Sequence, residues 1–585
     1  MGKIIKLIIA ILLLALPLAA RVASMSVPAV FTTAGAELVW LEVEIRNGTG
    51  EVYVATKPLV GIQTQDSART AFAVARKIAG VGSDYDALIR MRESTGSNSV
   101  EGPSAGGAMT LLILSVLENK TIRNDLTMTG TIDKDGSVGP VGGVGEKTKA
   151  AAYEGMKVIL IPRNSDVFDK MVLSVLGKRW NITIIEVSKI SEAANLAFGP
   201  KNATLKSNVI EVSPNPEVNL TATEINCSGC HIDEFRALAN SIINKNRALL
   251  DDVKKQNRSE FSYFIKMIES DIDEADNAEK WNYPYTGANS AFLTAINLNF
   301  LKDSNVTYDS FRSRMVEVDN CVNNAKRPQM TSENFEWVAG GDERLTWSRK
   351  KLYEVFNQNY TSDDDETILL LYKNVLNAES WCNVSNDMYS VAERIGGTPV
   401  DEGSLRAFAA GRIAEADSKI KTFGGADFGD ATWRFEAAKE EFNKSSFAAA
   451  IFDSNYLIST ISSLNVSQDA ESFLSTEFGS SRTWNGMWAA LYGNHAKYLY
   501  LKSKELGGTA GSSIMLVEYA HLLDGDAVRM KEIFKNPAAA GQAGQATGAT
   551  WQTPTSYESE LALLLVFCII IAIFLNLVQF FKKDE

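Results

Sequence analysis

The sequence predicts an α+β domain, then an all-α domain of irregular helical repeats, then a single C-terminal transmembrane helix. Three observations support this order. Strand and helix patterns alternate between residues 27 and 200, helical periodicity dominates between 233 and 535, and an apolar run of 21 residues occupies 561–581. At 585 residues the chain exceeds the roughly 250–300 residues that one core usually serves, so several domains are expected.

The charge balance is acidic, with 58 Lys and Arg against 71 Asp and Glu and a net charge of −13. Proteins that bind nucleic acids need a clustered basic face to neutralise phosphates, and the sequence shows no such cluster. The apolar content, 45%, is sufficient for a sizeable core. We therefore expect no nucleic-acid partner.

Residues 1–24 are predicted to be a secretory signal peptide. Lys3 and Lys6 precede an apolar run at 7–20, which is shorter than the about 20 residues that a helix needs to cross a bilayer. Small residues around Ala23 then provide a cleavage region. An uncleaved anchor is the alternative.

The α+β domain at 27–200 is expected to begin with two strands that form a hairpin, because Asn47-Gly48 between strands is a strong hairpin signal. Alternating and helical spacing of apolar residues predicts the other elements. The predicted strands are 38–45, 50–56, 85–91, 126–132, 137–141, 158–161 and 182–187. The predicted helices are 67–79, 104–117, 147–154 and 192–196.

Residues 201–232, rich in Asn, Thr, Ser and Pro, are predicted to be a linker to the helical domain at 233–535. Within that domain, residues 433–457 resemble a tetratricopeptide-type helix pair, but no 34-residue period repeats, so an irregular array is expected. The array can serve as a surface for partners or substrates, or as a plain spacer. Its clearest helices are 235–252, 366–380, 405–423, 432–443 and 484–506.

Residues 536–560 are low-complexity Ala, Gly, Gln and Thr and are predicted to be a flexible stalk. The apolar segment 561–581 is long enough to cross a membrane, and two lysines follow it directly. The positive-inside bias then places the tail, 582–585, in the cytoplasm. We therefore expect a single-pass protein of the cell membrane whose folded domains are extracytoplasmic.

Twelve Asn-X-Ser/Thr sequons lie between the two apolar segments and predict a glycoprotein. They begin at Asn47, Asn119, Asn181, Asn202, Asn219, Asn226, Asn257, Asn305, Asn359, Asn383, Asn443 and Asn465.

Four cysteines lie outside the predicted membrane segment: Cys227, Cys230, Cys321 and Cys382. An even number suits one or two disulfides, and three full pairings are open. The run from Cys227 to His231 also matches the C-x-x-C-H pattern of haem attachment, but a single copy beside a linker favours a disulfide. No HExxH metal motif occurs, and we expect neither a metal nor a cofactor.

The α+β domain contains no histidine and no cysteine, because the first of each are His231 and Cys227. A Ser-His-Asp triad within this domain is therefore excluded. A lysine can replace histidine as the base if desolvation lowers its pKa toward neutrality. The candidate pair is Ser104, which follows a Gly-Pro turn, and Lys147, which follows a glycine-rich run.

Ser104 stands at the start of a predicted helix, so the backbone N–H groups of Ser104 and Ala105 could stabilise an oxyanion. A serine at this position is more often only a helix cap. The glycine-rich run before Lys147 is not a phosphate-binding loop, because Glu146 stands where a Walker A motif requires glycine. No nucleotide partner is expected.

Three short motifs in this domain share the spacing of a known family. EGPSAG at 101–106, MTG at 128–130 and GGVGEK at 142–147 resemble the proteolytic domain of Lon proteases, whose pattern is (D/E)GPSAG, an MTG turn and GG-x-x-EK. The resemblance covers residues 30–200 and is far more specific than any one of the motifs.

The resemblance implies that Ser104 is the nucleophile and Lys147 the general base. It places Thr129 at the threonine that helps to hold the lysine, and Glu101 at the acidic position before the nucleophile turn. The sequence departs from many family members at Thr131, where they have glutamate.

The chain looks most like the archaeal ATP-independent, membrane-anchored Lon-like proteases, because no ATPase motif accompanies the proteolytic one. The resemblance implies a serine endopeptidase that cuts unfolded or surface polypeptides with a Ser-Lys dyad. Lon-type domains often form rings, which implies a homo-oligomer. The alternative is a catalytically inactive Lon-like fold that serves as a cell-surface binding module.

Overall fold

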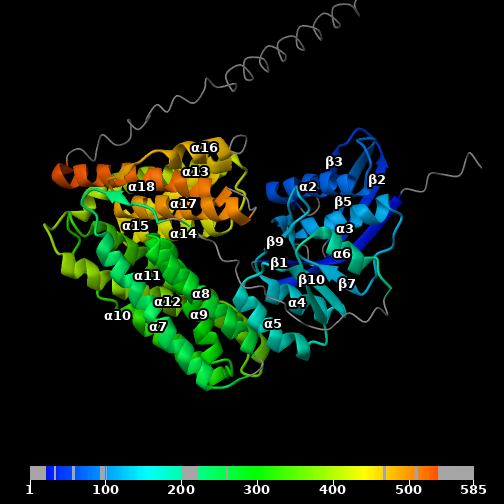
Figure 1. Ribbon diagram of the computed structural model, residues 1–585, viewed down its shortest axis with the longest axis horizontal. Coiled ribbons are helices and arrows are strands. Elements are labelled where there is room, and N and C mark those ends of the chain that lie inside the picture. Colours follow the sequence, from blue (N-terminus) through cyan, green and yellow to red (C-terminus); the bar gives the residue numbers. More distant parts are fainter. Residues whose placement is uncertain are drawn as a thin grey trace, which may run out of the picture.

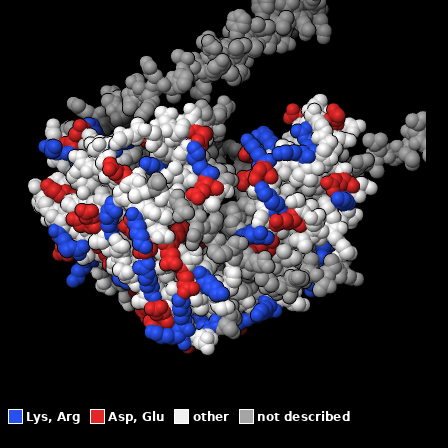
Figure 2. All heavy atoms as spheres, in the orientation of Figure 1, with Lys and Arg blue, Asp and Glu red and all other residues white. Residues whose placement is uncertain are grey.

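The computed structural model has an α+β part followed by an all-helical part, as expected, and the two lie side by side (Figure 1). On the face shown in Figure 2, Lys and Arg side chains are interspersed with Asp and Glu. The described residues are 21–31, 35–55, 59–92, 99–100, 102–200, 220, 222–258, 261–464, 470–506 and 511–537.

The first sheet has four strands in the order β1 (Arg21–Phe31), β2 (Gly35–Asn47), β5 (Tyr85–Arg92) and β3 (Val52–Val54). Strand β2 is antiparallel to both β1 and β5, whereas β3 is parallel to β5. The predicted hairpin between 38–45 and 50–56 is therefore wrong. Strand β2 pairs instead with β1, which the sequence pattern did not identify.

A side chain from β5 explains why the turn after β2 does not close a hairpin. The Asp86 carboxylate accepts hydrogen bonds from the backbone N–H groups of Glu51, Thr49 and Gly50 at 2.8–2.9 Å. These bonds hold the pKa of Asp86 below its usual range. The chain reverses after Asn47 as predicted. Because Asp86 binds residues 49–51, the chain then lies beside β5 instead of β2, and β3 pairs with β5.

The second sheet is parallel, with the order β11 (Thr183–Val187), β10 (Val158–Pro162) and β7 (Leu126–Met128). A short antiparallel pair, β8 (Thr131–Ile132) and β9 (Val138–Gly139), forms the hairpin expected around Asp135-Gly136. Another two-stranded pair joins β4 (Leu59–Val60) to β6 (Ser99–Val100).

Helix α3 (Gly106–Leu117) forms the centre of this part, because every residue from Gly106 to Val116 is buried. It shares one core with both sheets, with α2 (Ile62–Ala79) and with α6 (Ile190–Ala197). A helix that is apolar on all sides is stable only in such an enclosed position.

Two further helices join the α+β part to the helical part. Helix α4 (Val144–Tyr153) carries Lys147, and α5 (Val167–Arg179) was not predicted from the sequence. One face of α5 packs into a core of the helical part, where the rings of Phe168 and Phe300 are 4.6 Å apart.

The helical part is a series of paired helices that bury their apolar faces against one another. Helices α14 (Asp430–Asn443) and α15 (Phe447–Ser463), which include the predicted tetratricopeptide-type pair, pack together through Phe442 and Phe447. A short parallel pair of strands, β12 (Asn226–Cys227) and β13 (Thr483–Trp484), joins the start of this part to the segment just before its last two helices. Its helices are α7 (Ile232–Lys255), α8 (Ser262–Lys280), α9 (Pro284–Lys302), α10 (Tyr308–Asn324), α11 (Phe335–Phe356), α12 (Asp365–Ile395), α13 (Arg406–Thr422), α14 (Asp430–Asn443), α15 (Phe447–Ser463), α16 (Ala470–Gly479), α17 (Met487–Leu506) and α18 (Gly511–Lys535).

The predicted C-terminal transmembrane helix, and with it the single-pass membrane location, must be corrected. Among the described residues, no helix is both long enough and apolar enough to span a bilayer. The most apolar one, α3, has only 12 residues, whereas about 20 are needed. The longest one, α12, has 31 residues but carries charged side chains along its length. The predicted segment, 561–581, lies outside the described residues.

Several other predicted segments also lie outside the described residues: most of the signal peptide, the linker up to 219, the stalk beyond 537 and the tail. Ala23, in the expected cleavage region, lies inside strand β1 and pairs with Val43. The signal peptide and its cleavage stay predictions. Glycosylation stays a prediction.

Candidate active site

The turn that carries Ser104, called the nucleophile turn below, differs slightly from the helix start that the sequence predicts. Pro103–Ala105 form a 3₁₀ turn, and the α-helix begins only at Gly106. Helix α2 holds this turn from the side: Thr64 Oγ1 donates a hydrogen bond to the backbone oxygen of Gly102 at 3.0 Å, and Ser67 Oγ donates one to that of Pro103 at 3.2 Å. Ser104 thus lies on a turn fixed by its neighbours.

The MTG turn is bonded directly to the nucleophile turn. The N–H of Gly130 donates to the backbone oxygen of Ser104 at 2.8 Å, and the N–H of Gly107 donates to that of Gly130 at 3.0 Å. Thr129 is fully buried, and its Oγ1 also donates to the Ser104 oxygen, at 3.4 Å. These bonds join the MTG turn to the turn that carries Ser104, although 25 positions separate Ser104 from Thr129. The single strand expected at 126–132 is therefore divided into β7 and β8.

Close packing explains the two glycines that follow Ser104 and Ala105. A Cβ atom added to Gly106 would lie 2.5 Å from Ser67 Oγ, and one added to Gly107 would lie 2.4 Å from Met128 Cε. Real Cβ atoms do not approach other atoms so closely, so the neighbouring side chains would have to shift. The glycines therefore allow α3 to begin directly against α2 and the MTG turn.

Lys147 is buried in the first turn of α4, with 4% of its surface exposed. Burial, opposed by the nearby charge of Glu146, lowers the pKa of the Lys147 ammonium from 10.5 to about 8. The residue that caps the start of this helix is Gly143, whose φ of 66° favours glycine. The lysine therefore has the desolvated environment that a general base requires.

Ser104 and Lys147 line the same cleft, which has a volume of about 490 Å³. Val30 of β1 and Val141 contribute apolar surface to it, and Ala105 and Thr131 also lie on its wall. The structure thus brings the predicted nucleophile and base into one cavity, together with the residue where the sequence departs from the family pattern.

Sequence reasoning missed several residues of this cleft. Gln63 and Thr64 come from α2, and Asp427 and Gly429 come from the helical part of the chain. No local pattern identifies them, because only the tertiary fold brings them to the cleft that Ser104 lines. Glu101 lies outside the described residues.

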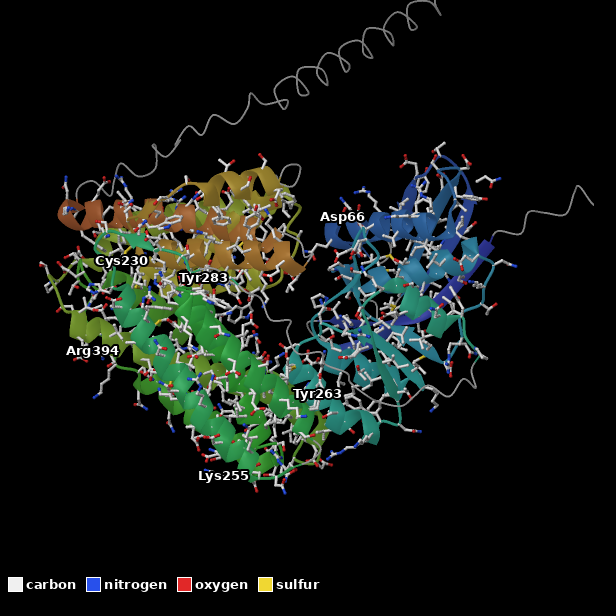
Figure 3. The ribbon with its side chains drawn as sticks, viewed as in Figure 1. Asp66, Cys230, Lys255, Tyr263, Tyr283 and Arg394 are labelled. Carbon is white, nitrogen blue, oxygen red and sulfur yellow. A yellow bond between two sulfur atoms is a disulfide. The ribbon has the colours of Figure 1, made fainter. Side chains whose placement is uncertain are left out.

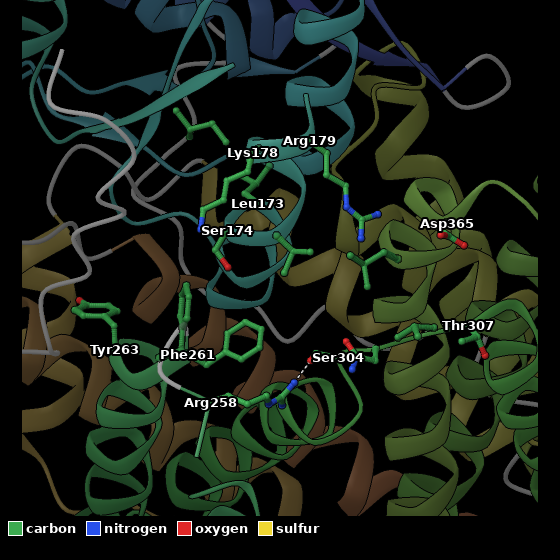
Figure 4. A pocket seen from close by; sticks show the side chains of 17 residues that line it. Leu173, Ser174, Lys178, Arg179, Arg258, Phe261, Tyr263, Ser304, Thr307 and Asp365 are labelled. Carbon is green, nitrogen blue, oxygen red and sulfur yellow. Dashed lines mark hydrogen bonds between the residues drawn. The ribbon is translucent and has the colours of Figure 1, made fainter. Parts of the chain in front are cut away.

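A second cavity, of about 750 Å³, lies between α5 and the helical part (Figure 4). Leu173 and Lys178 line one side, and Arg258 and Phe261 line the other. It is larger than the first cavity, but neither Ser104 nor Lys147 lines it. The predicted dyad residues therefore line only the smaller of these two cavities.

Four of the five cysteines are described by the structure, and these lie in the helical part and outside the cleft. Cys227 and Cys230 form one disulfide just before α7 (Figure 3), and Cys321 and Cys382 form another between α10 and α12. Within the described ranges, no three His, Cys, Asp or Glu side chains are grouped as metal ligands.

Comparison with known proteins agrees with the motifs. Residues 21–199 match the family described as Lon protease (S16) C-terminal proteolytic domain. The Lon protease of Fervidobacterium nodosum is 31% identical over 178 residues, which are 30% of this chain and 21% of that protein. The Lon protease of Desulfatibacillum aliphaticivorans is 33% identical over 175 residues, 29% of this chain and 21% of that protein. The chain thus spans about a fifth of the length of the curated relatives it matches.

Proposed function

Since residues 21–199 are a Lon-type serine protease proteolytic domain, we propose that this chain is an endopeptidase that cuts unfolded polypeptides with a Ser104–Lys147 dyad and without ATP. One observation carries the proposal. The hydroxyl-bearing residue and the buried lysine that the family pattern pairs also line one cleft, although 43 positions separate them in sequence.

In the proposed mechanism, the neutral amine of Lys147 takes the proton of Ser104 Oγ while Oγ attacks the peptide carbonyl. The backbone N–H groups of Ser104 and Ala105 are the proposed donors to the oxyanion. The C–N bond then breaks, and Lys147 gives the proton to the leaving amine. Water attacks the acyl-enzyme with Lys147 again as the base, which releases the second product and restores Ser104.

Two facts support activity without ATP. No Walker A sequence occurs in the 585 residues, and the glycine-rich run before Lys147 forms the start of a cleft-lining helix. We expect the cleavage rate of an unfolded substrate to be the same with and without Mg-ATP. A substrate that is stably folded should be cut much more slowly, because it does not expose extended chain.

The test is cleavage of reduced, carboxymethylated lactalbumin by the full chain. Ser104→Ala and Lys147→Met should each lower kcat/KM by at least about 1,000-fold, because dyad members act as a unit. Ser137→Ala and Lys134→Met are matched controls, since neither residue lines the cleft. They should retain wild-type rates.

Retained cleavage in Ser104→Ala or in Lys147→Met would contradict the dyad. The alternative, a catalytically inactive binding module, predicts that the wild type cuts nothing although it binds unfolded chains. The homo-oligomer stays a prediction.

A further inference from the structure

The larger cavity, of about 750 Å³, lies between α5 and the helical part, and neither residue of the proposed dyad lines it. Its volume is within the range of about 300–1,000 Å³ that pockets for small molecules have, and such pockets often lie where two domains meet. Figure 4 shows Leu173 of α5 on one side of this space and Arg258 and Phe261 on the other. Both parts of the chain therefore build a cavity of the size that holds a small molecule.

Much of the cavity wall is apolar. Leu173 of α5, Phe264 of α8 and Leu369 of α12 line it, and all three side chains are buried. Val175 and Val306 add two half-buried apolar side chains. An apolar chain or ring that enters this space leaves water, and binding gains from that transfer.

The charges on the wall are mostly positive. Lys178 and Arg179 come from the last turn of α5, and Arg258 lies just after α7. Within the described part of the chain, none of these three side chains forms an ion pair. Asp365 is the single carboxylate among the described lining residues, so three cations against one anion leave an excess of two positive charges.

Arg258 is held in place, but its own contacts do not use all of its donors. Its Nη1 donates a hydrogen bond to Ser304 Oγ (Figure 4), and the guanidinium carbon lies 4.8 Å from the centre of the Phe261 ring. Its Nη2 is buried and has no hydrogen-bond partner among the residues that the structure describes. A buried donor without a partner is unfavourable. A planar guanidinium fixed in this way is suited to the oxygens of a carboxylate or phosphate.

Helix ends do not cancel the positive charge. Three helices begin at the cavity, because Phe261 caps α8, Thr307 caps α10 and Asp365 is the first residue of α12. Three others, α5, α7 and α9, end at or just before residues that line it. The partial charges at helix starts and helix ends are opposite and of similar size, so they offset one another. The excess from the side chains remains, although the whole chain has a net charge of −13.

We propose that this cavity is a binding site for a small amphipathic anion, an apolar chain with a carboxylate or phosphate at one end. The chain packs against Leu173, Phe264 and Leu369, and Arg258 binds the anionic group with Lys178 and Arg179 nearby. Because the wall comes from both parts of the chain, the bound molecule contacts both. The inference goes beyond the proposed endopeptidase and does not depend on it.

The test measures binding of dansylaminoundecanoate, a fluorescent fatty-acid anion, to the full chain by its gain in fluorescence. Decanoate should displace this probe. Decyl maltoside has the same chain with an uncharged head group, and it should need a roughly tenfold higher concentration, because it makes no charge-assisted hydrogen bond to Arg258. Decyltrimethylammonium, whose head group is a cation, should displace the probe least.

Arg258→Met should raise the Kd of the probe about tenfold, because it removes the charge and the donors that bind the carboxylate. Arg258→Lys keeps the charge without the planar fork and should give an intermediate Kd. Arg312→Met is the matched control. Arg312 is exposed on α10 and does not line the cavity, so its replacement should leave the Kd unchanged.

Ser174→Trp tests the space itself without a change of charge. Ser174 is half-buried on the cavity wall, so an indole ring there fills part of the space that the apolar chain needs. The Kd should rise about tenfold, the effect of losing the burial of about two methylene groups. Ser313→Trp, at an exposed position of α10 outside the cavity lining, should bind like the wild type. Far-UV circular dichroism checks that each variant is folded.

A free fatty-acid anion and a membrane lipid offer the same chemistry, and vesicles of phosphatidylglycerol separate them. Cosedimentation with vesicles that both Arg258→Met and Ser174→Trp weaken supports the site and assigns it to a lipid head group. Unchanged cosedimentation, together with probe binding that both variants weaken, supports the site and assigns it to a free amphiphile.

The inference is overturned if decyl maltoside displaces the probe as well as decanoate does, or if Arg258→Met and Ser174→Trp both bind the probe like the wild type. Neither result involves cleavage of a polypeptide. Failure of the proposed endopeptidase therefore leaves this inference intact, and failure of the anion site leaves the endopeptidase intact.

Discussion

Lys149 Nζ donates a hydrogen bond to Thr367 Oγ1 at 2.9 Å, and this bond joins the helix that carries Lys147 to the first turn of α12. One turn further along α4, Tyr153 Oη donates to Glu366 at 2.9 Å. The helical part therefore contacts the face of α4 opposite the cleft. It is placed to fix the position of the candidate base as well as to line the cleft.

The close approach of Leu370 to Gly145 in this interface leads to the first prediction. A Cβ atom on Gly145 would lie 2.5 Å from Leu370 Cδ2. Gly145→Ala should displace α4, two residues before Lys147, and lower kcat/KM by about tenfold, since overpacking commonly costs about 1–3 kcal/mol. Leu370→Ala in the same chain removes the obstacle and should restore most of the activity. A double variant as impaired as Gly145→Ala would show that Leu370 does not transmit the effect.

The second prediction concerns pH. Because burial lowers the pKa of Lys147 to about 8, the neutral amine becomes more populated as pH rises toward 8 and saturates above it. The kcat/KM for an unfolded peptide should therefore increase about tenfold per pH unit below 7 and level off above about 8.5. A profile that is flat from pH 6 to 9 would rule out a titrating base with this pKa. Lys134→Met, an exposed lysine outside the cleft, should give the wild-type profile.

The third prediction concerns Glu441 in the core of the helical part. This side chain is fully buried, neither of its carboxylate oxygens has a hydrogen-bond partner among the residues that the structure describes, and burial raises its pKa well above 4.5. A folded-state pKa above the unfolded one stabilises the fold at low pH, and this stabilisation is lost as pH rises from about 4.5 through the folded value. Stability should therefore fall as pH rises above about 4.5.

Glu441→Gln removes the titration while keeping the shape of the side chain. It should flatten the pH dependence of urea unfolding and raise the unfolding free energy at pH 8 by about 1–3 kcal/mol relative to wild type. Glu436→Gln, on the exposed side of the same helix, is the control and should change little. An unaltered slope in Glu441→Gln would mean that other groups set the pH dependence.

The fourth prediction concerns the disulfide between Cys321 and Cys382. It links α10 to α12 and closes a loop of 61 positions. The bond therefore lowers the conformational entropy of the unfolded chain. Replacing both cysteines by serine should lower the unfolding free energy by about 2–4 kcal/mol. The Cys227–Cys230 disulfide spans only three positions, and the same replacement there should cost clearly less. Equal losses in the two variants would contradict the loop-entropy explanation.

Much of the α+β part was predictable because its signals are local. Alternating and helical spacing identified β5, β10, β11 and most of the helices to within a few residues. The prediction of a hairpin between 38–45 and 50–56 was wrong because a distant side chain, Asp86, binds the backbone after the turn. Helix α5 was missed because its apolar residues face two different cores, so no single face shows a clear period.

The sequence by itself determined the chemistry that the first 200 residues can offer. Without histidine or cysteine there, and with Ser104, Thr129 and Lys147 at the spacing of one family, it pointed to a serine and a lysine as the reacting pair. Only the tertiary structure decided what surrounds them. Burial, which lowers the pKa of Lys147, and the arrival of Asp427 at the cleft both depend on contacts between residues far apart in the chain, and local patterns carry no record of such contacts.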